Sequence, residues 1–394
     1  MIESSDDHGR LPLELVSNIL VRLPAEDLMD YCKFVCKRWR DEINTPKFIE
    51  SHNRRIFNNG NNIIKSIVLY STYKETLMCI DFHSNGHIKI NPIIHNVNSV
   101  DMTPVLVGSC TGLLCFACYD RNTNMAKSFS VYNPITGASK LVPWLEQHGL
   151  NPNFRNGFGY DCTSGDYKIL CFALDETETP RTICTCVYSF NTDSWKVNKE
   201  PCPLPFGLSQ GGIVFSNNAL HFITLSSDII KIIGFDLGTE KFHEIPLPVS
   251  HTSMIYCAQQ IELANLRGCL HLVTTTTEVW VMKEYGVKES WTQLFHYDIL
   301  SSTITDYKAM LRWGNEKIMP CAYSEDGSEI LVVIGTYSIN RFFCLDVHTL
   351  QLRKLEISTS HEWDWSRWEG VMPWVGSFVC PSTMYKGSSP YIEQ

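Results

Sequence analysis

The sequence predicts a small α-helical region at the N-terminus followed by a mainly β domain, built as a β-propeller of about six blades. Three observations lead to this prediction. Apolar residues recur at helical spacing only before residue 56, and from residue 63 onward short strand-like runs alternate with Gly, Asn, Asp and Pro. A loose repeat of roughly 45–60 residues also runs through the second part, which suits a four-stranded propeller blade.

Length and composition exclude several classes of protein. The chain has 394 residues, too many for one small domain, and its 44% hydrophobic content is enough for a sizeable core. The net charge of -9 and the lack of a long basic run argue against nucleic-acid binding. No apolar run approaches the roughly 18 residues of a membrane span, and the acidic, polar start MIESSDDHGR is unlike a signal peptide.

Two apolar stripes mark the helical region. Leu15, Ile19 and Leu23 recur at four-residue intervals, and a run from Val35 to Ile43 repeats that spacing. Three short helices in about forty residues are too few to build a full core, so some apolar surface needs a partner. The helices could form a cap on the rest of the chain, or dock on another protein.

The segment LPLELVSNILVRLPAEDLMDYCKFVCKRW resembles the F-box, because Leu-Pro, Glu-Leu, Ile-Leu, Arg-Leu-Pro and Val-Cys-Lys-x-Trp follow in its order and spacing. The resemblance implies docking on the Skp-family adaptor of a cullin-RING ubiquitin ligase. The residues that it implies for adaptor binding and packing are Leu11, Pro12, Leu15, Ile19, Leu20, Leu23, Pro24, Leu28, Val35, Cys36 and Trp39. An apolar helical surface suits such docking, but the pattern does not separate residues facing the adaptor from residues facing inward.

The β domain begins with short runs such as SIVLYS at 66–71 and LMCIDF at 77–82. A unit of strand, Asn or Asp, turn and strand then recurs. Its polar residues are Asn133, Asn191, Asp236 and Asp346. We interpret the unit as a propeller blade, because radial closure hides sheet edges; the alternative is an irregular β-sandwich. We expect the ring to close by pairing of strands at Ile63–Tyr70 and Val375–Cys380.

Several β segments, among them GSCTGLLCF, YNPITG, GFGYDCTSGDYKIL and FDLGTEKFHEIPLP, resemble the kelch-like, plant F-box-associated interaction domain of S-locus F-box proteins. The resemblance implies the substrate-recognition subunit of an SCF-type E3 ubiquitin ligase, working in the cytoplasm or nucleus, whose β domain captures an unidentified protein target for ubiquitination. We therefore expect a flexible N-terminus at 1–10, an F-box at 11–55, the β domain at 62–382 and a flexible tail at 383–394.

Catalytic motifs are missing from the sequence: there is no Gly-x-Ser-x-Gly, His-Glu-x-x-His, Walker loop or GxGxxG. Cys115 and Cys118 form one CxxC without a second pair, so we expect packed, reduced thiols. We expect a non-catalytic receptor without metal or cofactor. Two alternatives stay open: a β scaffold acting outside a ligase, and a galactose-oxidase-like copper enzyme. Such an enzyme needs Tyr and His ligands and a Tyr–Cys crosslink, for which the 16 Tyr and 16 Cys of the chain supply residues.

The segment HEWDWSRWEGVMPW at 361–374 holds four of the ten tryptophans of the chain. Trp374 adjoins a strand and is expected in the core. Exposed Trp beside Arg is common in protein-binding hot spots. We therefore hypothesise that Trp363, Trp365, Arg367 and Trp368 contribute to a substrate-facing surface.

Overall fold

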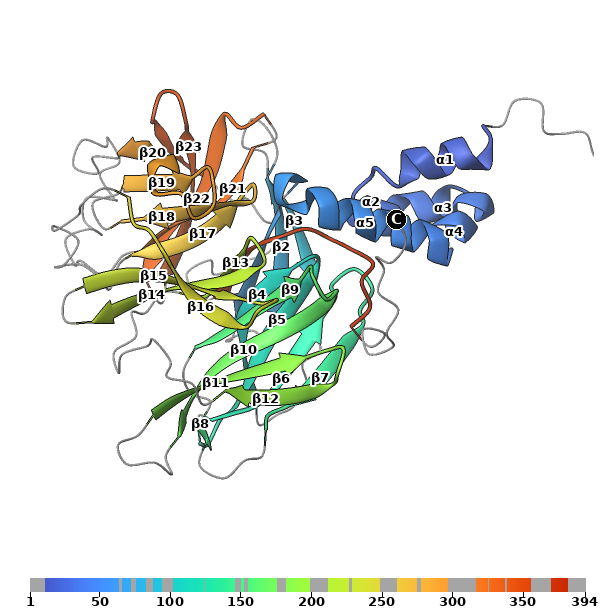
Figure 1. Ribbon diagram of the computed structural model, residues 1–394. Helices are drawn as coiled ribbons and strands as arrows, with labels where there is room; N and C mark the ends of the chain where they lie inside the picture. Colours follow the sequence, from blue (N-terminus) through green and yellow to red (C-terminus); the bar gives the residue numbers. More distant parts are fainter. Residues whose placement is uncertain are drawn as a thin grey trace, which may run out of the picture.

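A helical N-terminal region is joined to a six-bladed β-propeller in the computed structural model (Figure 1), which confirms the predicted fold class. No helix among the described residues is long and apolar enough to cross a membrane. The structure describes residues 11–63, 66–71, 76–82, 88–93, 102–123, 125–145, 150–151, 155–175, 182–198, 212–226, 229–248, 261–274, 278–296, 317–324, 326–336, 339–355 and 370–381.

The helical region consists of short segments whose ends follow from proline and threonine positions. These are α1 (Leu13–Leu20), α2 (Ala25–Asp27), the π-helical turn η1 (Leu28–Cys32), α3 (Lys33–Val35), α4 (Lys37–Ile43) and α5 (Pro46–Ile63). Pro12 and Pro24 directly precede α1 and α2, and Pro46 begins α5, where a missing backbone N–H is tolerated. The hydroxyl of Thr45 accepts the Phe48 N–H at 3.2 Å and so caps α5.

Each blade is an antiparallel sheet. Blade 1 contains β25 (Gly370–Trp374), β1 (Ser66–Ser71), β2 (Thr76–Phe82) and β3 (Ile88–Ile93), and blade 2 contains β4 (Met102–Cys110), β5 (Leu113–Asp120), β6 (Ala126–Tyr132) and β7 (Ser139–Pro143). Blade 3 contains β9 (Asn156–Asp161), β10 (Asp166–Asp175), β11 (Thr182–Ser189) and β12 (Ser194–Asn198), and the short β8 (Leu150–Asn151) also pairs with β10. Blade 4 contains β13 (Val214–Ser216), β14 (Ala219–Ser226), β15 (Ile229–Asp236) and β16 (Lys241–Ile245). Blade 5 contains β17 (Glu262–Leu266), β18 (Cys269–Val273), β19 (Glu278–Met282) and β20 (Trp291–His296), with the 3-10 turn η4 (Lys288–Ser290), and blade 6 contains β21 (Lys317–Tyr323), β22 (Glu329–Thr336), β23 (Ile339–Asp346) and β24 (Leu352–Lys354).

Apolar clusters between successive blades hold the ring together. Each of the six pairs of neighbouring blades shares one cluster, including the pair formed by blades 6 and 1. The second strand of a blade is therefore apolar on both faces: every residue of β5 from Leu113 to Cys118 is buried, whereas in the outer strand β7 only Val142 is. A β-sandwich has no such cyclic series of interfaces, so the sandwich alternative is wrong.

The ring closes through β25, which pairs antiparallel with β1 in a register that places Gly370 opposite Tyr70 and Trp374 opposite Ser66. The prediction that Val375–Cys380 is the closing strand is wrong, since this segment follows β25 and joins no sheet. Its alternation of apolar and small residues resembled a strand. Its backbone instead forms hydrogen bonds with the side chains of Asn133 and Asn53, which lie outside the sheets.

Buried polar side chains also cross from blade to blade. Lys168 of blade 3 is 8% exposed, and its Nζ donates to the Leu237 carbonyl at 2.6 Å and lies 3.1 Å from Glu240 and 3.4 Å from Asp161. Burial opposes the charge of Asp161, but its hydrogen bonds from Ser164 and Thr163, together with Lys168, lower its pKa to about 2.

The helical region joins one end of the propeller, which we call the helical end. β1 begins there at Ser66, and the turn Thr111–Gly112 lies there too, because Trp374 Nε1 donates to the Gly112 carbonyl at 3.1 Å. β4 runs toward that turn, so it begins at the opposite end, which we call the far end. Gly370, the first residue of β25, also lies at the far end.

Candidate protein-docking surface

The helical region carries most of the large apolar side chains that are exposed among the described residues. Seven of ten belong to residues 11–35, and the other three are Val105, Leu141 and Leu350 on the propeller. We call the seven the apolar face: Leu11, Leu13, Leu15, Ile19, Tyr31, Phe34 and Val35. Exposed apolar residues gathered in one short segment indicate a surface that a partner covers.

Helix α1 is apolar on two sides, and it contributes Leu13, Leu15 and Ile19 to the apolar face. Val16 and Leu20, four residues apart, point into the core of the helical region, and Leu20 is fully buried. Leu15 and Ile19, also four residues apart, lie on a different side, and Ile19 is 52% exposed. A surface helix that serves only as a cap needs one apolar stripe, so the second stripe indicates a docking surface.

Three further residues of the apolar face lie on η1 and α3. Tyr31 is exposed on η1. Phe34, at 73% the most exposed large apolar residue that the structure describes, lies beside Val35 at the end of α3. Cys36 then has extended backbone angles of φ -161° and ψ 165°, so α3 ends there and α4 starts in a new direction. Burying one such side chain stabilises a complex by about 1.5–3 kcal/mol.

The apolar face rests on a packed core. This core contains Val16, Leu20, Ala25, Leu28, Cys32, Ile43 and Phe48, with one further residue, Phe378, from the other end of the chain. His52 is fully buried beside it, and its Nε2 lies 3.0 Å from the Leu23 carbonyl oxygen. Burial lowers the pKa of His52, which keeps the ring neutral, so that no charge is buried beside the apolar core.

The structure divides the residues that the F-box resemblance implied. The exposed ones are Leu11, Pro12, Leu15, Ile19, Pro24, Val35 and Cys36. Leu20 and Leu28 are buried in the core, and Leu23 and Trp39 are half-buried against it. Sequence reasoning missed Leu13, Tyr31 and Phe34; their apolar character within the motif was the signal that could have identified them.

The substrate-facing hypothesis falls on Trp363, Trp365, Arg367 and Trp368, which lie outside the described residues. Gly370, which follows Trp368 by two positions in the sequence, is the first residue of β25 and lies at the far end of the propeller. Trp374, expected in the core, is 2% exposed and packs in the cluster between blades 1 and 2.

Cysteines and potential metal ligands occur in both parts of the described chain. Within the described ranges no three His, Cys, Asp or Glu side chains are grouped as metal ligands. The described cysteines are free thiols, and Cys115 and Cys118 are both buried. Burial raises the pKa of Cys110 and Cys321 to about 12, so these thiols carry little reactive thiolate.

Comparison with known proteins finds two families, in the order of the two parts of the structure. The F-box-like family matches residues 8–53, and the F-box associated beta propeller domain matches residues 66–361. An F-box/kelch-repeat protein of Arabidopsis thaliana is 30% identical over 303 residues, covering 72% of this chain and 78% of that protein. The F-box protein CPR1 of Arabidopsis thaliana is 25% identical over 377 residues, covering 88% of this chain and 84% of that protein.

Proposed function

Because this chain belongs to the family of F-box proteins with an F-box associated β-propeller domain, we propose that it is the substrate-recognition subunit of an SCF-type E3 ubiquitin ligase. The F-box docks on a Skp-family adaptor, which links it to a cullin-RING ligase, and the propeller holds a protein target. The work takes place in the cytoplasm or nucleus. Ubiquitin transfer is carried out by other subunits, so the chain itself is non-catalytic.

The apolar face is the observation that carries this proposal. Leu15, Ile19 and Phe34 stand exposed on a packed helical core. Apolar anchors on a helix are the groups that a partner's hydrophobic groove takes up. A cap on the propeller, the other role considered for these helices, does not account for them. The propeller meets the helical region elsewhere, through Phe378 and Ile135, which pack on the core rather than on the apolar face.

Adaptor binding is tested by titrating the full-length protein with a purified Skp-family adaptor. We expect Ile19→Asp and Phe34→Asp each to weaken binding at least tenfold, with the melting temperature unchanged. Leu141→Asp is the matched control, because Leu141 is 63% exposed but lies on β7 of the propeller. Absence of binding by the unaltered protein, or equal binding by all three variants, contradicts the proposal.

Target capture is assigned to the far end of the propeller, since the helical end is occupied by the F-box. The hypothesis for Trp365 and Trp368 agrees with this assignment, because β25, the next strand in the sequence, begins at the far end. Changing both to Ala should abolish co-purification of targets, with ubiquitin transfer blocked, while stability stays within about 1 kcal/mol. Loss of stability together with capture, or capture that is unaffected, refutes the hypothesis.

A further inference from the structure

The segment Val375–Pro381, which we call the strap, connects the closing strand of the propeller to the F-box core. It follows β25 directly and runs toward the helices, where Figure 1 draws it in red beside α2 and α5. It contacts both parts of the molecule through side chains that are themselves buried. The strap is a second connection between F-box and propeller, in addition to the covalent link between α5 and β1.

On the propeller side the strap is fixed to two turns of blade 2. Ser377 is fully buried, and its Oγ donates to the Thr111 carbonyl at 2.7 Å. The neighbouring Gly112 has φ +87°, and a Cβ there would lie 2.6 Å from Ser377 Cβ. Only glycine therefore permits both the backbone angle and the close approach of the strap.

Asn133 makes the second attachment, and its amide group explains why Asn stands at this position. The side chain is fully buried, and Nδ2 donates to the carbonyls of Ser377 at 2.9 Å and Val379 at 2.6 Å. The equivalent turns of blades 4 and 6 use Asp236 and Asp346, whose carboxylates accept backbone N–H groups of their own turns at 2.6 and 2.7 Å. A carboxylate therefore suits the turn itself, whereas the two contacts with the strap carbonyls require an amide donor.

On the F-box side the strap supplies a core residue. Phe378 belongs to the F-box core, and its ring meets His52 edge-on at 5.0 Å between centroids. The Phe378 N–H donates to Asn53 Oδ1 at 2.9 Å. Gly376 passes so close to Glu26 that a Cβ there would lie 2.8 Å from the carboxyl carbon. The F-box core is thus completed by a residue more than three hundred positions away in the sequence.

We propose that the strap is a positioning element that fixes the orientation of the propeller relative to the apolar face. Phe378 and Asn133 are its two positioning residues, one at each end. Two separate attachments prevent rotation about the link between α5 and β1, so that a target at the far end is presented at a constant place relative to the adaptor. The presentation of a target rests on the proposed function; the rigid coupling does not.

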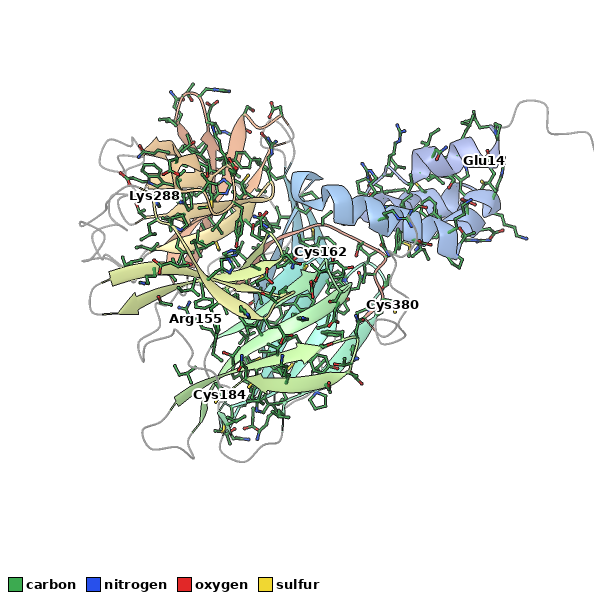
Figure 2. The ribbon with its side chains drawn as sticks, in the orientation of Figure 1. Glu14, Arg155, Cys162, Cys184, Lys288 and Cys380 are labelled. Atoms are coloured by element: carbon green, nitrogen blue, oxygen red, sulfur yellow. The ribbon has the colours of Figure 1, made fainter. Side chains whose placement is uncertain are left out.

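The coupling is tested by pulsed electron paramagnetic resonance on the full chain. Spin labels are placed on two exposed cysteines, Cys36 of the F-box and Cys162 of the propeller, after the other accessible cysteines are replaced by serine. Figure 2 labels the position of Cys162 on the propeller. The unaltered strap should give one narrow distance distribution. Asn133→Asp keeps the side-chain oxygen that accepts the Ile135 N–H within the turn. It also places a carboxylate against the carbonyls of Ser377 and Val379, and should therefore broaden the distance distribution. Asn191→Asp is the matched control, because Asn191 occupies the equivalent turn of blade 3, and should leave it narrow.

Adaptor titration of unlabelled protein adds a second readout. Phe378→Ala opens the F-box core and should weaken adaptor binding at least tenfold, whereas Phe378→Leu should restore most of it. Asn133→Asp leaves that core intact and should change binding less than threefold. A narrow distribution in Asn133→Asp, or binding by Phe378→Ala within twofold of the unaltered chain, overturns the inference. An unaltered chain that binds no adaptor yet shows the narrow distribution refutes the proposed function alone.

Discussion

The carboxyl group of Glu26 makes the junction between F-box and propeller sensitive to pH. Burial is the largest of the effects that raise its pKa from 4.5 to about 7. The carboxylates of Asp81 on β2 and Asp27 on α2 raise the pKa further, and hydrogen bonds from the backbone N–H groups of Glu26 itself and Gly376 lower it in part. Changing Glu26 to Gln removes the charge while keeping the shape of the side chain.

The direction of the effect follows from proton binding. The folded chain holds the Glu26 proton more tightly than the unfolded chain, so folding is favoured at low pH, and this advantage is lost as the pH rises from about 4.5 through about 7. The difference between these pKa values corresponds to at most about 3 kcal/mol. Above pH 7 the folded protein contains a charged carboxylate near Asp81, and Glu26→Gln relieves that cost.

Denaturant unfolding of the two proteins at pH 4.5 and pH 8 measures this effect. The free energy of unfolding of Glu26→Gln, relative to the unaltered chain, should rise by about 2–3 kcal/mol between these pH values. Glu14→Gln is the control, because Glu14 is exposed on α1 (Figure 2). The free energy of unfolding of Glu14→Gln, relative to the unaltered chain, should change by less than about 0.5 kcal/mol between the two pH values. A Glu26→Gln difference that is independent of pH, or that falls as pH rises, refutes the reasoning.

Three further predictions concern stability and use paired variants or one deletion. Leu20→Ala should lower the free energy of unfolding by about 2–5 kcal/mol in denaturant titrations, whereas Ile19→Ala should lower it by less than about 1 kcal/mol and weaken adaptor binding instead; equal stabilities would contradict the assignment of their sides. Lys168→Met should cost about 3–5 kcal/mol in thermal unfolding because it removes the cation beside the buried carboxylate of Asp161, whereas Lys231→Met removes an exposed pair and should cost about 0–1 kcal/mol. Truncation after Pro373 removes the end of the closing strand and should lower the melting temperature of the whole propeller by about 5–10 °C; a propeller that melts unchanged would show that closure is dispensable.

Local patterns made much of the fold predictable. The helical stripes and proline positions around α1 and α4 act within a few residues, and the blade unit at Asn133, Asp236 and Asp346 repeats because each turn satisfies its own backbone. The F-box motif identified most of the exposed apolar residues. It did not distinguish Ile19 from Leu20, because both lie on a helix that is apolar on two sides.

Contacts between distant parts of the chain escaped the sequence analysis. Val375–Cys380 has the alternation of a strand, and whether such a segment pairs in a sheet depends on which partners are nearby. Here Asn133 offers two donors and the F-box core offers a space for Phe378, so the segment leaves the sheet after Trp374. The raised pKa of Glu26 has the same origin, since burial at the junction and Asp81 on the propeller both contribute to it.

Hydrogen–deuterium exchange on the full-length protein, with and without a purified Skp-family adaptor, tests the central claim most directly. If the apolar face docks on the adaptor, amide exchange should slow by at least tenfold within residues 13–35, which span α1 to α3, and stay unchanged in the propeller blades. Protection confined to the propeller, or no protection at a saturating adaptor concentration, would contradict the assignment of the helical region as the docking surface.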